Sequence, residues 1–182
     1  MDKLIAKSAC SGLLPITIGT MTVKEIIPEV ITSLAPLKGQ EAALSKSLKA
    51  KHGIALPQAN EMTRDGAVMA VWGGSHVYLM GATPDTSVSA VASLTDQTDG
   101  WSVVSVSGPD IEALFARLTP VDVRIAQFPV GRSIRTQLKH MNVILMRTEV
   151  EEFTVMAFRS MAKTLVHDLS EAMTSLKART AL

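Results

Sequence analysis

The stretch WSVVSVSGPDIEALFARLTPVDV (Trp101–Val123) contains a complete strand, turn and helix. Residues 101–106 are rich in valine with a leading tryptophan, which favours a strand. The tetrapeptide at 107–110 has small capping residues, a proline at the first helical position and an acid near the positive end of the helix dipole. Apolar residues then recur at the spacing that builds one helical stripe, namely Ile111, Leu114, Phe115 and Leu118. The stretch therefore predicts a strand followed by an amphipathic helix that ends at Pro120.

Downstream, the pattern predicts a long strand over 134–146 and a hairpin partner over 153–158. The charged residues 147–152 are expected to form the turn between these two strands. Residues 161–177 predict a closing amphipathic helix. Its inward face is expected to carry Leu165, Leu169, Met173 and Leu176.

Upstream, the β-branched segment 23–34 predicts a strand that Pro28 interrupts. A helix is expected over 36–52, with Leu37, Leu44 and Leu48 on its apolar face. Two short apolar runs, 67–72 and 77–80, are joined by Gly73-Gly74-Ser75 and predict a hairpin. The Ala- and Ser-rich segment 84–94 predicts a short helix behind a Thr83 cap.

Both halves of the chain thus combine antiparallel strands with helices. The sequence predicts an α+β fold with two small lobes of antiparallel sheet, each with helices packed on one face. We expect an extended amino-terminal arm over 1–20, a first lobe over 21–94 and a second lobe over 95–182.

Composition excludes several classes of partner. The chain has 182 residues, and 18 Lys and Arg nearly balance 17 Asp and Glu, so no basic excess is available to bind nucleic acid. No window approaches 18 uninterrupted apolar residues, which argues against a membrane span. Cys10 is the one cysteine, so no internal disulfide is possible. We expect a cytoplasmic protein that binds neither nucleic acid nor membrane.

Motifs for catalysis or cofactor binding are lacking. Neither GxGxxG nor GxxxxGK[ST] occurs, and the glycines at 73–74 join two strands. His167 and Glu171 lie four residues apart, with Lys163 one turn earlier, but zinc needs at least three protein ligands, so a solvated face is favoured. His140 is expected in an apolar strand, and the Asp96 and Asp99 carboxylates are expected to terminate turns. No catalytic, cofactor-binding or metal-binding residue is assigned.

Two resemblances go beyond these patterns. TDQTDGW (Thr95–Trp101) followed by VSGPDIEALFARLTPVDV (Val106–Val123) resembles the folate-binding fold of aminomethyltransferases. FPVGRSIRTQLKHMNVILMR (Phe128–Arg147) and FRSMAKTLVHDLSEAM (Phe158–Met173) are similar to the carboxy-terminal half of the gamma subunits of heterotetrameric sarcosine oxidases. Three shorter stretches agree with that family, namely SGLLPITIG (Ser11–Gly19), HGIALP (His52–Pro57) and VWGG (Val71–Gly74).

The resemblance implies a complex of alpha, beta, gamma and delta chains. Such enzymes oxidise sarcosine to glycine and hydrogen peroxide and pass the one-carbon unit to tetrahydrofolate. It implies that FAD, FMN, NAD, tetrahydrofolate and zinc belong to the partner subunits, and that this chain is a non-catalytic interaction subunit without a cofactor. The alternative is an autonomous folate-binding protein or an aminomethyltransferase-like enzyme, although this chain lacks the further domain that walls the folate pocket of the glycine-cleavage T-protein.

Contacts with partner subunits are expected at the amino-terminal arm and in the second half of the chain. Aromatic residues and arginines are the usual anchors of interfaces. The candidates are Trp101, Phe128, Arg132, Arg135 and His140. For Trp101 and Phe128 the alternative is an ordinary place in the core.

Overall fold

The computed structural model describes residues 5–180, and its strands form two antiparallel sheets. The six-stranded sheet has the order β1-β2-β8-β11-β10-β9, and the five-stranded sheet has the order β4-β5-β6-β3-β7. The strands are β1 (Ile16–Ile18), β2 (Met21–Ile26), β3 (Ile31–Pro36), β4 (Met62–Asp65), β5 (Val68–Trp72), β6 (Val77–Met80), β7 (Ala92–Asp96), β8 (Trp101–Ser107), β9 (Ser133–Leu138), β10 (Met141–Glu149) and β11 (Glu152–Phe158). The α-helices are α1 (Glu41–His52), α2 (Ile111–Leu118) and α3 (Ala162–Thr180). The predicted α+β fold with two antiparallel sheets is confirmed.

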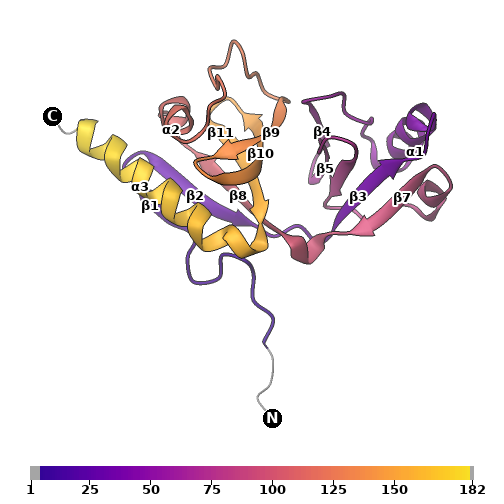
Figure 1. The fold of residues 1–182 in the computed structure, drawn as a ribbon, viewed down its shortest axis with the longest axis horizontal. Helices are drawn as coiled ribbons and strands as arrows, with labels where there is room; N and C mark the ends of the chain where they lie inside the picture. The colour runs from indigo at the N-terminus through magenta and orange to yellow at the C-terminus, as the bar shows by residue number, and fades with distance from the viewer. Residues whose placement is uncertain (1–4, 181–182) are drawn as a thin grey trace.

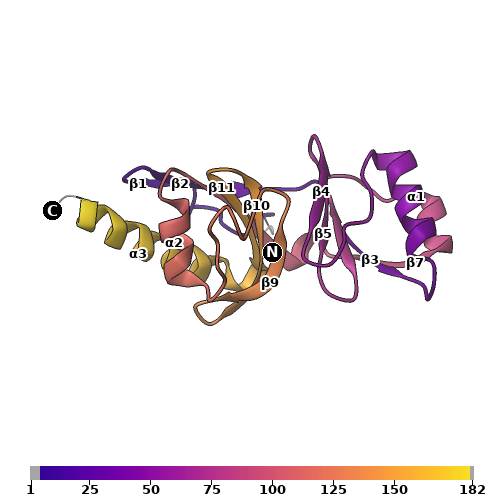
Figure 2. The ribbon, with the colours of Figure 1, turned by 90° about the horizontal axis from the view of Figure 1, so that it is seen from above.

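These elements stack in four layers (Figures 1 and 2). Helices α2 and α3 cover the outer face of the six-stranded sheet, while α1 lies outside the five-stranded sheet. The inner faces of the two sheets pack against each other. Three clusters of buried side chains fill the spaces between successive layers, so the two sheets are joined through a shared apolar core.

Side chains of the central strands alternate between two buried layers. On β11, Phe153, Val155 and Ala157 pack toward α2 and α3, whereas Met156 packs toward the other sheet. The same alternation holds on β8, where Val104 faces the helices and Val103 faces the second sheet. Because successive side chains of a strand point to opposite faces, a strand buried on both faces reads as a continuous apolar run.

The two helices predicted near the carboxyl end are present. Ile111, Leu114, Phe115 and Leu118 of α2 are all buried, as are Leu165, Leu169 and Met173 of α3, while Leu176 is partly buried. Helix α2 begins at Ile111, so Pro109 lies before the helix and not at its first position as predicted. Helix α1 begins at Glu41 rather than at residue 36, so Leu37 lies before it and is exposed, while Leu44 and Leu48 are buried as predicted.

The single strand predicted over 23–34 is wrong. β2 ends at Ile26 and pairs with β8 of the six-stranded sheet, whereas β3 begins at Ile31 and pairs with β6 and β7 of the other sheet. Pro28 lies in the segment 27–30, which crosses from one sheet to the other. Its missing N–H therefore removes no hydrogen bond between strands. Residues 21–26 therefore pair with the sheet of the second half, which differs from the expected first lobe over 21–94.

The long strand predicted over 134–146 is also wrong. It is a hairpin of β9 and β10, which turns at Lys139 and His140 with Lys139 at a φ of 49°. The helix predicted over 84–94 is a 3₁₀ turn, η1 (Thr86–Ala90), followed by β7. Its cap is Asp85, which accepts from the Ser87 amide at 3.0 Å, rather than Thr83.

The amino-terminal segment is attached more firmly than an extended arm over 1–20 would be. Cys10 is buried, and its amide donates to Glu25 at 2.7 Å. The Ser8 hydroxyl donates to the same carboxylate at 2.6 Å, and β1 pairs with β2. Residues 1–4 of the predicted arm lie outside the described residues.

Candidate functional site

Two of the five predicted interface residues lie in the core. Trp101 is 7% exposed and packs between Tyr78, at 5.1 Å between ring centroids, and Phe158, at 4.9 Å. Phe128 is 3% exposed, and its ring centroid lies 5.7 Å from that of Phe153. Both aromatic residues fit the alternative that they are core residues, and they leave little surface for a partner.

The other three candidates lie along one hairpin. Arg132 directly precedes β9 and is half-buried, Arg135 is exposed on β9, and His140 is exposed in the turn. Arg135 donates to the Gly73 carbonyl at 3.5 Å, so it reaches across to the β5–β6 turn. The structure therefore separates the five candidates into a buried aromatic pair and a basic row of Arg132, Arg135 and His140, of which the last two are exposed.

A small polar group surrounds the end of the β5–β6 hairpin. The His76 and Tyr78 rings meet edge to face at 4.8 Å. Burial, with the nearby Arg135 charge, lowers the pKa of His76, and burial raises the pKa of Tyr78. Both shifts favour the uncharged form of the ring, and the contacts of His76 are with Ser75 and Tyr78.

The carboxylates near His167 are held by a lysine. One ligand atom from each of His167, Asp168 and Glu171 lies within 4.8 Å of the others, a spacing that suits a metal ion. However, the Lys139 ammonium donates to Asp168 at 3.1 Å and to Glu171 at 2.7 Å. A lysine cation thus occupies the position between the two carboxylates, which argues for a structural clamp between the β9–β10 turn and α3.

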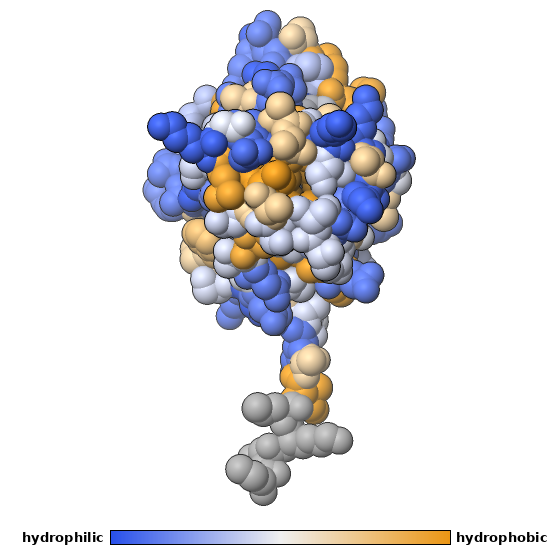
Figure 3. Space-filling view, turned by 90° about the vertical axis from the view of Figure 1, so that its right-hand side faces the viewer, coloured by the Kyte–Doolittle hydropathy of each residue, from blue (hydrophilic) through white to orange (hydrophobic). Residues whose placement is uncertain are grey.

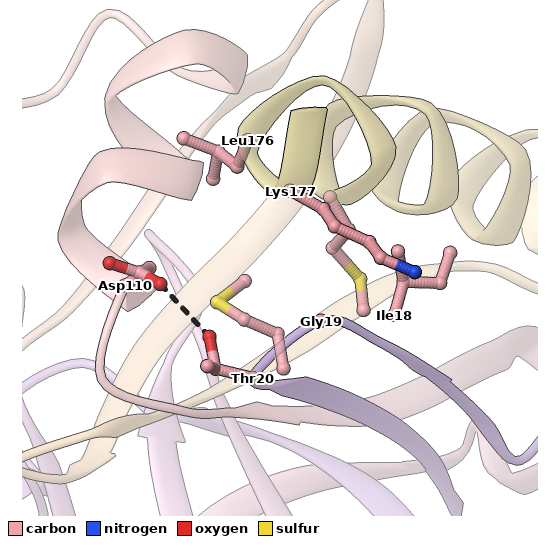
Figure 4. Close-up of a pocket in the computed structure, with 8 residues that line it drawn as sticks. Ile18, Gly19, Thr20, Asp110, Leu176 and Lys177 are labelled. Atoms are coloured by element: carbon pink, nitrogen blue, oxygen red, sulfur yellow. Dashed lines mark hydrogen bonds between the residues drawn. The ribbon is translucent and has the colours of Figure 1, made fainter. Parts of the chain in front are cut away.

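A hollow of about 230 Å³ lies between the β1–β2 turn, the start of α2 and the end of α3 (Figure 4). The Thr20 hydroxyl donates to Asp110 at 2.9 Å on one side, and the Lys177 side chain lies on the other. Ligand pockets are typically about 300–1,000 Å³. This hollow is smaller than that range and its carboxylate already has a partner, so it does not form a convincing ligand site.

The crossing between the sheets forms an exposed apolar ridge. Ile27 is 72% exposed, and Ile26 and Pro28 flank it. Hollows of about 280 Å³ and 300 Å³ lie on either side, and both are lined by these three residues. The sequence pattern predicts a strand over this segment and does not reveal the ridge. Pro28, which interrupts an apolar run, is the residue that could have indicated it.

Another misinterpreted residue is Arg147, which was expected in a charged turn. It lies within β10 and is 0% exposed. Its guanidinium donates to the carbonyls of Val150, at 2.6 Å, and Val123, and to Glu112 at 3.0 Å. It thereby ties the β10–β11 turn, α2 and the loop after α2 together.

None of the helices described between residues 5 and 180 has both the length and the apolar character needed to cross a membrane.

Comparisons with known proteins give a consistent match. No family model matches the chain. The chain is 29% identical over 143 residues to the sarcosine oxidase gamma subunit of Corynebacterium sp. (strain U-96), which covers 72% of this chain and 70% of that protein. The structure of this chain is similar to that of a chain of the heterotetrameric sarcosine oxidase from Corynebacterium sp. U-96, with a TM-score of 0.78 and 21% identity. The match covers 94% of this chain and 96% of that chain. Aspartokinase III of E. coli matches with a TM-score of only 0.42 and 14% identity over 87% of this chain and 34% of that chain. The sequence match, together with the shared fold, makes this chain a homologue of the sarcosine oxidase gamma subunit.

Proposed function

We propose that this chain is the gamma subunit of a heterotetrameric sarcosine oxidase and serves as a non-catalytic interaction subunit. The similarity to the gamma subunit of Corynebacterium sp. (strain U-96), 29% over 143 residues, carries the proposal. The match extends over 70% of that protein, so it concerns most of the subunit rather than a single motif.

In this assignment the partners are the alpha, beta and delta subunits. The complex oxidises sarcosine to glycine and hydrogen peroxide and passes the one-carbon unit to tetrahydrofolate. FAD, FMN, NAD, tetrahydrofolate and zinc are bound by the partner subunits, and the complex works in the cytoplasm.

The proposed contacts include the basic row of Arg132, Arg135 and His140. Arginine is a frequent anchor of interfaces, and Arg135 and His140 are exposed in the isolated chain. Their positions on one hairpin allow a single partner surface to reach both.

The test is co-expression of this chain with the alpha, beta and delta chains of the same organism, followed by purification through a tag on this chain. A four-chain complex with sarcosine-dependent peroxide production is expected, whereas the isolated chain should be colourless and inactive. Arg135→Ala combined with His140→Ala should weaken assembly, with Arg117→Ala as the exposed control on α2. Flavin bound to the purified chain alone, or failure of the four chains to associate, would contradict the proposal.

A further inference from the structure

The edges of the two sheets are protected to different degrees. β1 has only three residues, so it offers little edge to another chain. The edge strands β4 and β9 meet at their first residues, since the Met62 amide donates to the Gly131 carbonyl at 2.9 Å and the Ser133 amide to the Asn60 carbonyl at 3.0 Å. Natural proteins shorten or cover edge strands in this way because unpaired strands attract other chains.

Among the described residues, β7 makes no such contact along its outer side. It has five residues, contains neither proline nor lysine, and pairs on one side only, with β3. Figure 1 shows no other segment along its outer side. The residues from Ser93 to Asp96 are all exposed, and Leu94 is 37% exposed at the centre of the strand. β7 therefore presents an open edge of ordinary strand length.

The hydrogen-bond register shows which backbone groups point outward. The Leu37 amide donates to the Val91 carbonyl at 2.9 Å, and the Gln97 amide donates to the Ile31 carbonyl at 2.8 Å. In an antiparallel pair the residues alternate between bonding the partner and pointing away from it. Since residues 91 and 97 bond to the β3 side, Ala92, Leu94 and Asp96 direct their N–H and C=O groups away from the sheet.

The surrounding surface suits a protein partner. Figure 3 looks at the end of the molecule that contains α1 and β7, and shows apolar surface near its centre with hydrophilic side chains around it. Leu37 and Leu94 are the two large apolar residues of this end that are more than one-third exposed. An added strand would cover the apolar side chain of Leu94 while its backbone bonded the outward groups.

We propose that β7 is a docking edge to which an extended segment of a partner chain, carrying a Lys or Arg opposite Asp96, adds as a sixth antiparallel strand of this sheet. The proposal rests on the assignment of this chain as a subunit of a larger complex. The docking edge places one contact on the five-stranded sheet, whereas Arg132, Arg135 and His140 lie on or beside β9 of the six-stranded sheet.

Charge favours a different chain over a second copy as the occupant. The Asp96 carboxylate accepts from the Thr98 amide at 2.9 Å and from its hydroxyl at 2.7 Å, and these bonds lower the pKa of Asp96. Asp96 therefore stays charged, yet no cation pairs with it among the described residues. If the β7 strands of two copies of this chain paired symmetrically about Leu94, Asp96 of one copy would lie opposite Ala92 of the other, which supplies no cation. A partner strand with a Lys or Arg opposite Asp96 would pair with its charge.

The experiment compares Leu94→Pro with Leu94→Thr in the four-chain complex. Proline at position 94 removes the outward N–H and puts ring atoms in its place. It breaks no hydrogen bond to β3, because the N–H of residue 94 points away from β3. Threonine keeps the amide and favours a strand. We expect Leu94→Pro to weaken assembly at least about tenfold and Leu94→Thr to weaken it by less. Asp96→Asn, which keeps an oxygen for Thr98, should weaken assembly about threefold at low salt and less at high salt.

Two measurements make the outcome decisive. Hydrogen exchange of the wild-type chain should show a Leu94 amide that exchanges fast alone and slowly in the complex, a readout that holds even if the proline variant folds poorly. Unchanged exchange at Leu94, or normal assembly of a folded Leu94→Pro variant, overturns the docking edge but leaves the subunit assignment intact. A homodimer of the isolated chain that Leu94→Pro abolishes would identify a second copy as the occupant and overturn the proposal. Failure of the wild-type chain to assemble at all overturns the subunit assignment itself.

Discussion

The two faces of the six-stranded sheet are both buried, but different side chains pack on them. The face toward α2 and α3 is filled largely by valine, leucine and phenylalanine, and the Phe153 ring contacts those of Phe115 and Phe128. The layer between the other face and the five-stranded sheet is rich in methionine. Met146 and Met156 of the six-stranded sheet meet Met62 and Met80 of the five-stranded sheet there, in one cluster with Tyr78 and Trp101. Methionine is flexible and fills irregular gaps.

The difference indicates that the helix face is specified by close packing of rigid side chains, while the layer between the sheets tolerates changes of shape. A face built from phenylalanine and leucine should lose much stability when a side chain is truncated. A methionine-rich layer should accept substitutions of similar volume. Each of the following predictions tests that contrast, and they run from the largest expected effect to the smallest.

The largest loss is expected for Phe153→Ala. Phe153 is fully buried, and its ring lies 4.8 Å from Phe115 and beneath the Arg147 guanidinium at 4.5 Å. Truncating such a phenylalanine typically lowers the free energy of unfolding by about 3–5 kcal/mol. The matched control is Phe158→Ala on the same strand, since Phe158 is 45% exposed and should lose less. Chemical denaturation of both variants measures the difference, and equal losses would contradict the contrast.

A smaller loss is expected for Arg147→Met, which keeps much of the side-chain volume but removes the charge. The change leaves the carbonyls of Val123 and Val150 without their donor. The buried Val123 carbonyl left unpaired costs about 1–3 kcal/mol, partly offset because a buried charge is no longer desolvated, whereas Val150 is exposed and water can replace its donor. We expect a net loss of about 1–2 kcal/mol by urea denaturation.

The control for that variant is Arg64→Met. Arg64 pairs with Glu149 at 2.5 Å, but both side chains are substantially exposed. Exposed pairs contribute about 0–1 kcal/mol, so this variant should be close to wild type. If Arg147→Met were as stable as Arg64→Met, the buried arginine would contribute no more to the helix face than a surface pair does.

The same contrast explains which parts of the fold the sequence could predict. Helix α2 has one buried face, so Ile111, Leu114, Phe115 and Leu118 repeat at a helical spacing that a single sequence reveals. The central strands are buried on both faces, so their residues form apolar runs without alternation. The turn within 134–146 was missed for a different reason, because Lys139–His140 is not a typical hairpin dipeptide.

Residues that act through tertiary contacts were beyond prediction from local pattern. Arg147 stands in a charged stretch, and only the fold shows that Val123, Val150 and Glu112 gather around its guanidinium. The exposed positions of Arg135 and His140 agree with a surface role, yet nothing in the sequence distinguished them from Trp101 and Phe128, which lie in the core. The open edge of β7 was hidden because the segment was predicted to be helical.

A still smaller effect is expected for Met156→Leu in the layer between the sheets. Met156 is fully buried and packs in the methionine-rich cluster. Swaps that conserve hydrophobic volume usually cost less than about 1.5 kcal/mol, and the neighbouring methionines can adjust to the branched side chain. The double variant with Met146→Leu should lose little more. A loss as large as that of Phe153→Ala, measured by thermal and urea unfolding, would show that this layer is as tightly specified as the helix face.

The smallest effect concerns the clamp that Lys139 forms between the β9–β10 turn and α3. The hydrogen bond and charge of Lys139 lower the pKa of Glu171. A carboxylate with a lowered pKa in the folded state stabilises the protein above its ordinary pKa, and that contribution is lost as the pH falls through the lowered value. The wild type should therefore lose more stability than Lys139→Met between about pH 5 and pH 3. Lys51→Met is the control, because hydrogen bonds from Ser87, more than Lys51, lower the pKa of Asp85. Parallel pH profiles for wild type and Lys139→Met would mean that packing alone holds α3 on the sheet.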